Sequence, residues 1–132
     1  MIESLILLIA DAQKRGKITG IRVTPNICLT HLLFVDDVLL FGLGTLEEWQ
    51  GYKEVLDLFC SATSMTISVE KSSFLFSDIE EGTREQILSL LPYSMEPITT
   101  GFKYLSYRLK PLGYCTNDWH WIVKNFERRI SN

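Results

Sequence analysis

Long apolar runs, repeats and low-complexity tracts are missing from this chain of 132 residues. The apolar stretch 5–10 has six residues, whereas a helix that spans a bilayer needs about 20. Glu3 precedes this stretch and no basic residue does, so we expect no secretory signal peptide. The composition is that of an ordinary globular protein. We therefore expect an intracellular protein, nuclear or cytoplasmic, with no membrane partner.

Cysteine and histidine are also scarce. The three cysteines, Cys28, Cys60 and Cys115, are widely spaced, which suits free thiols in a reducing compartment. His31 and His120 lie far apart in the sequence, and the five residues form no zinc-site pattern. Structural roles are expected for all five.

The net charge of −3 is unevenly distributed. Residues 23–101 carry a net charge of −9, whereas residues 1–22 carry +2 and residues 102–132 carry +4. An acidic chain argues against broad nonspecific binding of nucleic acid, although the basic C-terminal segment could meet phosphates. From charge alone, a solvated helix face is the simpler interpretation of that segment.

The most informative segment is 31–42, in which Asp36 and Asp37 interrupt an otherwise apolar sequence. Adjacent carboxylates repel each other, and burying them without a cation would cost several kcal/mol. The apolar, β-prone runs 29–35 and 38–43 predict a β-hairpin with Asp-Asp at its turn. Both carboxylates would project from the tip, where they could share a divalent cation such as Mg²⁺. The alternative is a turn that merely happens to use aspartate.

Helices and strands alternate irregularly in the rest of the chain. Helical spacing of apolar residues predicts helices over 2–15, 45–62 and 83–92. The second and third begin with capping boxes, at 45–48 and 83–86. Strands are predicted over 17–24, 66–69, 73–76 and 102–109. This order predicts an α+β fold with antiparallel β-hairpins packed by helices.

A last amphipathic helix is predicted to begin after residue 116 or 117. Its apolar face would consist of Trp119, Ile122, Val123, Phe126 and Ile130.

Phe34-Val35-Asp36-Asp37 resembles the catalytic hairpin of reverse transcriptases. It looks most like the non-LTR (LINE-type) retrotransposon family, whose usual form is Phe-Ala-Asp-Asp. The stretch 59–72 is similar to the family segment that ends in Asn-x-x-Lys-Ser, and 103–106 resembles Lys-Tyr-Leu-Gly. The segment 119–129 resembles the Trp-led helix that follows. The four blocks agree in order and spacing, and the sequence looks plant-like.

The resemblance implies a partial polymerase palm over 1–113 and the start of a thumb or connection helix, amphipathic and thumb-like, over 114–132. It implies two-metal nucleotidyl transfer with Mg²⁺ or Mn²⁺, and an RNA template and DNA primer as partners. Asp36 and Asp37 match the catalytic, metal-binding aspartates of this hairpin. Lys71 matches a lysine proposed to neutralise the leaving pyrophosphate, although a surface lysine in a turn is an equal alternative.

The primer-holding hairpin of the family is matched by four residues. These nucleic-acid-binding candidates are Lys103, Tyr104, Leu105 and Ser106. Strand packing is the alternative for Tyr104 and Leu105, and Ser106 replaces the glycine of the family.

A third aspartate, on a strand upstream of this hairpin, is required by the family and has no counterpart in this sequence. We therefore expect the isolated chain to lack polymerase activity and to self-associate through an exposed palm edge. One alternative is a non-catalytic remnant that binds nucleic acid or protein through 102–132. Another is a metal-dependent nuclease in which Glu70 or Asp78 joins the aspartate pair.

Overall fold

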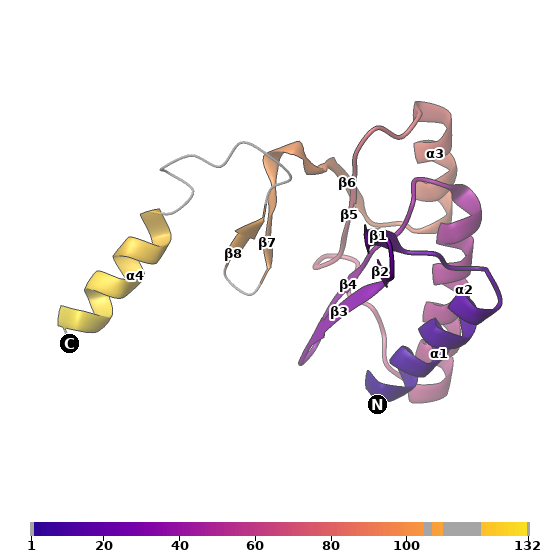
Figure 1. Ribbon diagram of the computed structural model, residues 1–132, viewed down its shortest axis with the longest axis horizontal. Coiled ribbons are helices and arrows are strands. Elements are labelled where there is room, and N and C mark those ends of the chain that lie inside the picture. The colour runs from indigo at the N-terminus through magenta and orange to yellow at the C-terminus, as the bar shows by residue number, and fades with distance from the viewer. Residues whose placement is uncertain (1, 105–106, 110–119, 132) are drawn as a thin grey trace. The chain divides into compact units, whose positions relative to one another are not determined.

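The computed structural model describes residues 2–104, 107–109 and 120–131 (Figure 1). Contacts divide the chain into two compact units, Met1–Met95 and Glu96–Asn132. The predicted palm–thumb boundary at 113 and the predicted start of the last helix lie outside the described residues.

Three helices of the first unit enclose its core. They are α1 (Ile2–Lys14), α2 (Leu46–Thr63) and α3 (Glu81–Leu90). Figure 1 shows α1 and α2 side by side. The core consists of Leu5, Ile9, Ala12, Ile18, Trp49, Tyr52, Val55, Phe59, Phe74, Ile87 and Leu91. Burial of these side chains is the main stabilising contribution to the unit.

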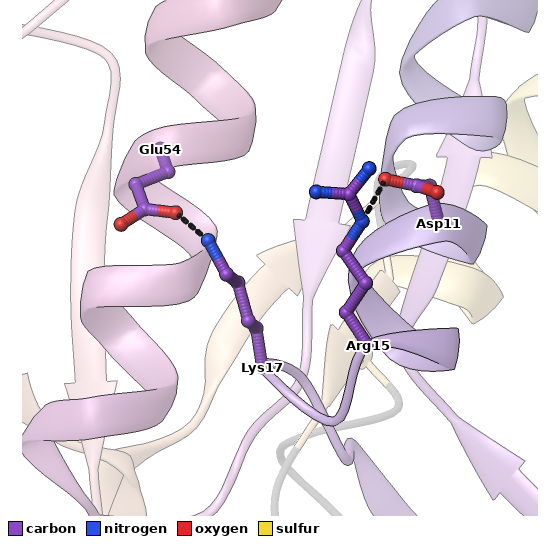
Figure 2. Close-up of polar contacts among 4 residues, drawn as sticks. All are labelled: Asp11, Arg15, Lys17 and Glu54. Carbon is purple, nitrogen blue, oxygen red and sulfur yellow. Dashed lines mark hydrogen bonds and ion pairs between the residues drawn. The ribbon is translucent and has the colours of Figure 1, made fainter.

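The helix α1 ends two residues before a glycine. Gly16 has a φ of +74°, a left-handed conformation that glycine adopts without a steric penalty. The backbone N–H of Lys17 then donates to the Ala12 carbonyl at 3.0 Å. This turn directs the chain along α2, where the Lys17 ammonium reaches the Glu54 carboxylate at 2.6 Å (Figure 2).

Strands occur only in pairs within the described residues. In the first unit β1 (Ile21–Thr24) pairs with β2 (Ile27–Leu29), and β3 (His31–Phe34) pairs with β4 (Asp37–Leu40), both antiparallel. The strand β5 (Ser73–Phe76) is bonded to β6 (Ser94–Pro97). Helices packed on small antiparallel hairpins confirm the predicted α+β class.

The second unit contains a short 3₁₀ turn, η1 (Ile98–Thr100), a hairpin and a helix. The antiparallel hairpin pairs β7 (Phe102–Tyr104) with β8 (Tyr107–Leu109). The helix is α4 (His120–Ser131), in which Val123, Phe126 and Ile130 are all exposed. The helix is therefore where the sequence predicts one, and the described part of its apolar face is open to solvent.

Two predicted strands are wrong in part. The 102–109 strand is a hairpin rather than one continuous strand, and the 17–24 strand begins only at Ile21. Lys17, Ile18 and Thr19 instead follow the surface of α2, with Ile18 buried at 1% exposure. Ile18 lies in the segment that connects α1 to β1, and its side chain packs in the core between the helices. Local β propensity does not reveal such a long-range contact.

The predicted strand 66–69 is absent from this described part of the chain. Ser64 ends α2 in the left-handed conformation, with a φ of +59°. A turn follows at 69–71, where the Ser72 N–H donates to the Val69 carbonyl at 3.4 Å. The β-prone residues between these points have no neighbouring strand to pair with, so propensity alone does not make a strand.

Neither predicted capping box forms. Thr45 is the N-cap of α2 but makes no side-chain capping bond, and Glu48 uses its carboxylate elsewhere. The helix α3 begins at Glu81, so Thr83 lies inside its first turn rather than at its cap. The helices themselves are confirmed, because their apolar stripes are buried in the core.

Candidate metal-binding hairpin

The β3–β4 hairpin carries the aspartate pair at its tip. The strands pair His31 with Leu40 and Phe34 with Asp37, so a two-residue turn of Val35 and Asp36 connects them. The predicted hairpin is confirmed. The prediction that both aspartates form the turn is wrong by one residue, because Asp37 is the first residue of β4.

Both carboxylates of the pair are exposed to solvent. This exposure agrees with the prediction that both carboxylates project from the hairpin tip. The turn directs Asp36 into water, and Asp37 lies at the solvent end of its strand. Water screens their mutual repulsion, so the fold tolerates the pair without a bound cation.

The two faces of the hairpin have different surroundings. Leu33 and Leu40 pack against the core. Because side chains alternate along a strand and directly paired residues share a face, Phe34 and Asp37 lie on the opposite face. Phe34 is 54% exposed. Neither β3 nor β4 pairs with a further strand in the described residues, so the outer edges of this hairpin are unpaired there.

Val35 adopts an unfavourable backbone conformation at the tip. Its φ is +53°, which is rare for a β-branched residue. A positive φ at the first residue of a two-residue loop is typical of type II′ turns, which favour glycine there. Val35 therefore introduces backbone strain next to Asp36.

A buried carboxylate, Glu48 in the first turn of α2, holds the base of the hairpin. Its Oε1 accepts the N–H groups of Thr19 and Gly20, both at 2.7 Å, and its Oε2 accepts that of Leu43 at 2.6 Å. Only 4% of Glu48 is exposed. Hydrogen bonds to a carboxylate are stronger than neutral ones, so Glu48 ties together the segments that precede β1 and follow β4.

The Tyr52 hydroxyl contacts the two strands at their base. It lies 3.0 Å from the Thr30 carbonyl oxygen and also contacts the carbonyl oxygen of Phe41. The N–H of Phe41 donates to the Thr30 carbonyl at 2.9 Å and extends the ladder by one pair. Burial, followed by the charge of nearby Glu48, raises the pKa of the Tyr52 phenol. Tyr52 therefore donates as a neutral phenol over the ordinary pH range.

Trp49 completes these contacts from the same turn of α2. Its indole Nε1 donates to the Leu43 carbonyl at 2.9 Å. Its ring lies 5.0 Å from the Tyr52 ring and 4.8 Å, edge to face, from the Phe74 ring. Glu48, Trp49 and Tyr52 are called the α2 anchor below.

Sequence reasoning did not identify the α2 anchor as a group. It assigned Glu48 to a capping box and included Trp49 and Tyr52 only as residues of the predicted helix 45–62. A signal was available, because Glu48 precedes Tyr52 by four residues and therefore shares its helix face. A carboxylate on the buried face of a helix needs hydrogen-bond donors from another part of the chain.

The other predicted site residues lie on other elements of the chain. Lys71 is exposed in the 69–71 turn. Lys103 is exposed in β7 and Tyr104 is half-buried there, while Leu105 and Ser106 lie outside the described residues. The strand β7 belongs to the second unit, whereas Lys71 and the aspartate pair belong to the first. The roles of Lys71 and of the 103–106 segment therefore stay predictions.

A complete metal cage is not formed by the described residues. Within 2–104, 107–109 and 120–131, no three His, Cys, Asp or Glu residues cluster closely enough to hold an ion. Glu70 and Asp78 therefore do not join the aspartate pair in a three-ligand group, which leaves the nuclease alternative without geometric support. Cys28 and Cys60 are free thiols, and Cys115 lies outside the described residues.

A small pocket of about 70 Å³ lies between α1 and α2. Two ion pairs line it, Lys17 with Glu54 and Arg15 with Asp11, the second at 3.0 Å (Figure 2). Each cation is already neutralised by a carboxylate, and all four side chains are substantially exposed. The pocket therefore resembles a groove between packed helices more than a ligand site.

Comparisons with protein-family models, curated proteins and solved structures found no match to this chain. Among the described helices, none combines the length and apolar content that crossing a bilayer requires.

Proposed function

We propose that this chain is part of the palm of a LINE-type reverse transcriptase, the RNA-directed DNA polymerase of non-LTR retrotransposons. The observation that carries the proposal is the β3–β4 hairpin, which presents Asp36 and Asp37 exposed at its tip. The segment 31–42 also resembles the catalytic hairpin of that family. This resemblance suggests that the chemistry of the hairpin is metal-dependent nucleotidyl transfer. The α+β class is compatible with a partial palm.

Mg²⁺ or Mn²⁺ is the cofactor that this function requires. Asp36 and Asp37 offer carboxylate oxygens, the ligands that Mg²⁺ prefers, and their exposure leaves room for water and substrate phosphates. When bound, two cations activate the primer hydroxyl and stabilise the leaving pyrophosphate. Because no third carboxylate joins the pair in the described residues, the chain fits an incomplete site that needs another ligand.

Two further sets of residues have proposed roles in this function. Lys71 would neutralise the leaving pyrophosphate, a task suited to an exposed ammonium on a flexible side chain. Lys103 and Tyr104, with Leu105 and Ser106, would contact the primer end. These assignments rest on the family resemblance of the 59–72 and 103–106 blocks.

The metal-binding part of the proposal is tested by Mn²⁺ titration of the ¹⁵N-labelled chain. Paramagnetic broadening should affect amide signals at the hairpin tip before those of α1. The double variant Asp36→Asn/Asp37→Asn should lose this effect. The control Glu80→Gln/Glu81→Gln, which alters another adjacent exposed pair, should retain it. Absence of selective broadening in the wild type would refute metal binding by the hairpin.

Polymerase activity of the isolated chain is a separate question. With two of three catalytic carboxylates, the purified chain should give no primer extension above the Asp36→Asn variant. Extension above that level would show that the site is complete without an upstream aspartate. An in-frame aspartate motif in the genomic sequence upstream of the Met1 codon would support the origin of the chain from a polymerase.

A second function, nucleic-acid binding without catalysis, is favoured by the register of β7–β8. This register places Lys103 opposite Arg108 and Tyr104 opposite Tyr107. In β7 the exposed ammonium of Lys103 is available to a phosphate, and the neighbouring Tyr104 has an aromatic ring of the kind on which bases stack. The hairpin thus combines both features that single-stranded nucleic acids require.

RNA binding measured by fluorescence anisotropy at several salt concentrations tests this second function. The variant Lys103→Ala/Arg108→Ala should weaken binding and flatten its salt dependence. The control Lys14→Ala/Arg22→Ala removes equal charge from the first unit and should have less effect. Equal losses in both variants would indicate only a nonspecific response to net charge.

A further inference from the structure

The buried carboxylate of Glu48 has no role in the chemistry proposed for the hairpin tip. Its hydrogen bonds are nevertheless concentrated on the segments from which the hairpins emerge. Gly20 immediately precedes β1, and Leu43 follows β4 by three residues. A charged group committed to three backbone donors fixes the positions of those segments relative to α2.

We propose that Glu48 is the positioning residue of the Asp36–Asp37 hairpin. It holds the segment that leaves β4 against the first turn of α2, and thereby sets where the two aspartates are presented. The positioning itself does not depend on any activity. Only its consequence for metal binding rests on the proposed function.

The contacts at Leu43 support this inference most directly. Glu48 accepts the Leu43 N–H at 2.6 Å, and Trp49 donates to the Leu43 carbonyl at 2.9 Å. Both backbone polar groups of one residue are thus bound by consecutive residues of α2. Two bonds to one residue restrict its orientation as well as its position, which a single bond does not.

The α2 anchor also binds the chain where it enters the hairpin. Tyr52, one helical turn after Glu48, contacts the carbonyl of Thr30 just before β3. Gly20, held by Glu48, lies so close to β2 that a Cβ atom there would be 2.5 Å from the Leu29 carbonyl oxygen. The α2 anchor therefore contacts the chain on both sides of β3–β4.

Small movements at this base reach the tip because the hairpin is short and regular. Each strand has four residues, a length of about 13 Å. A two-residue turn adds little freedom. A rotation of the base therefore displaces Asp36 and Asp37 rather than being absorbed within the strands.

The variant Glu48→Gln tests the inference in the full chain. An amide has one acceptor oxygen and a donor NH₂ group, so it cannot replace both carboxylate oxygens. Either Leu43 or the Thr19–Gly20 segment loses its acceptor. Hydrogen exchange by NMR should show protection of amides in 31–40 reduced by about tenfold or more, with a smaller change in α1.

Two further variants separate positioning from general stability. Glu47→Gln changes the exposed neighbour of Glu48 and should leave exchange in 31–40 unaltered. Gly42→Ala retains Glu48 but places a methyl group 3.2 Å from its carboxyl carbon and from the Trp49 ring. If Glu48→Gln does not fold, Gly42→Ala should still loosen 31–40 selectively by displacing the carboxylate.

The outcomes are distinct. Selective loss of protection in 31–40 would support the positioning role, whereas a uniform loss throughout the first unit, or no change, would overturn it. Mn²⁺ broadening at Asp36 and Asp37 should weaken in Glu48→Gln. If the wild type shows no broadening but the exchange effect is present, the proposed function fails and the positioning role stands.

Discussion

The base and the tip of the β3–β4 hairpin differ in nearly every physical respect. At the base, buried Glu48 and Tyr52 bind backbone groups within a core of apolar side chains. At the tip, Asp36 and Asp37 are exposed, and Val35 has an unfavourable φ. The difference indicates that stability resides at the base and that the candidate chemistry resides at the tip. Variants of the two ends should therefore have separable effects.

The largest effect is expected at the base, from Trp49→Ala. This variant removes an indole that is 8% exposed, with its ring contacts and its bond to Leu43. Large-to-small changes of this kind cost about 3–5 kcal/mol. Urea unfolding followed by circular dichroism measures the loss. Trp49→Phe keeps an aromatic ring and should lose clearly less stability. Equal losses in the two variants would mean that the ring kept by Phe contributes nothing to packing at this position.

Tyr52→Phe removes one hydroxyl from the base and should cost about 1–2 kcal/mol at neutral pH, because the single hydroxyl proton that faces the Thr30 and Phe41 carbonyls is lost. Burial raises the folded-state pKa of this phenol above its usual 10.0. The folded chain therefore binds the phenol proton more tightly than the unfolded chain does. The contribution of the Tyr52 hydroxyl to stability is present below about pH 10 and is lost progressively above it.

The pH dependence gives a second measurement for the same variant. Above about pH 10, Tyr52 should lower the stability of the wild type by up to about 1.4 kcal/mol per pH unit. Phe has no such titration, so the stability gap between the two proteins should narrow between about pH 8 and about pH 11. A gap that widens with pH would contradict burial of the phenol.

At the tip, Val35→Gly should increase stability by about 0.5–1 kcal/mol. Glycine adopts a positive φ without the penalty that a β-branched side chain has, although it loses more entropy on folding. The matched variant Val38→Gly changes a strand residue of β4 and should destabilise the chain. Urea midpoints of both variants give the comparison; destabilisation by Val35→Gly would argue against a positive φ.

The sequence was sufficient to predict the hairpin and α2, because apolar runs and helical spacing are local signals. It was not sufficient for the register. Turn rules favour Asp-Asp at the tip over a valine with positive φ. The observed register instead pairs Thr30 with Phe41, whose carbonyls both meet the Tyr52 hydroxyl. That partner lies on a different element, so short-range rules could not identify it.

The role of Glu48 was missed for a related reason. A capping box is a local motif, and 45–48 satisfies it in sequence. In the fold, long-range donors from Thr19 and Gly20 take the Glu48 carboxylate, and Thr45 makes no capping bond. A motif describes which groups are available to bond, whereas packing decides which of them meet.

The smallest effect on stability is expected from Asp36→Asn and Asp37→Asn. Both residues are exposed, so each substitution should change the free energy of unfolding by no more than about 0.5 kcal/mol, and removal of one charge from the pair relieves repulsion. The same substitutions should weaken Mn²⁺ binding, because each removes one carboxylate ligand.

This combination separates the tip from the base more sharply than any single variant. Stability and Mn²⁺ broadening should change together when Glu48 is replaced, but only broadening should change when the aspartates are replaced. Measuring both quantities on the same samples makes the comparison independent of differences in protein quality. If either aspartate variant destabilised the chain by as much as Tyr52→Phe, the aspartates would be structural turn residues. That result would argue against a metal-binding role for the hairpin tip.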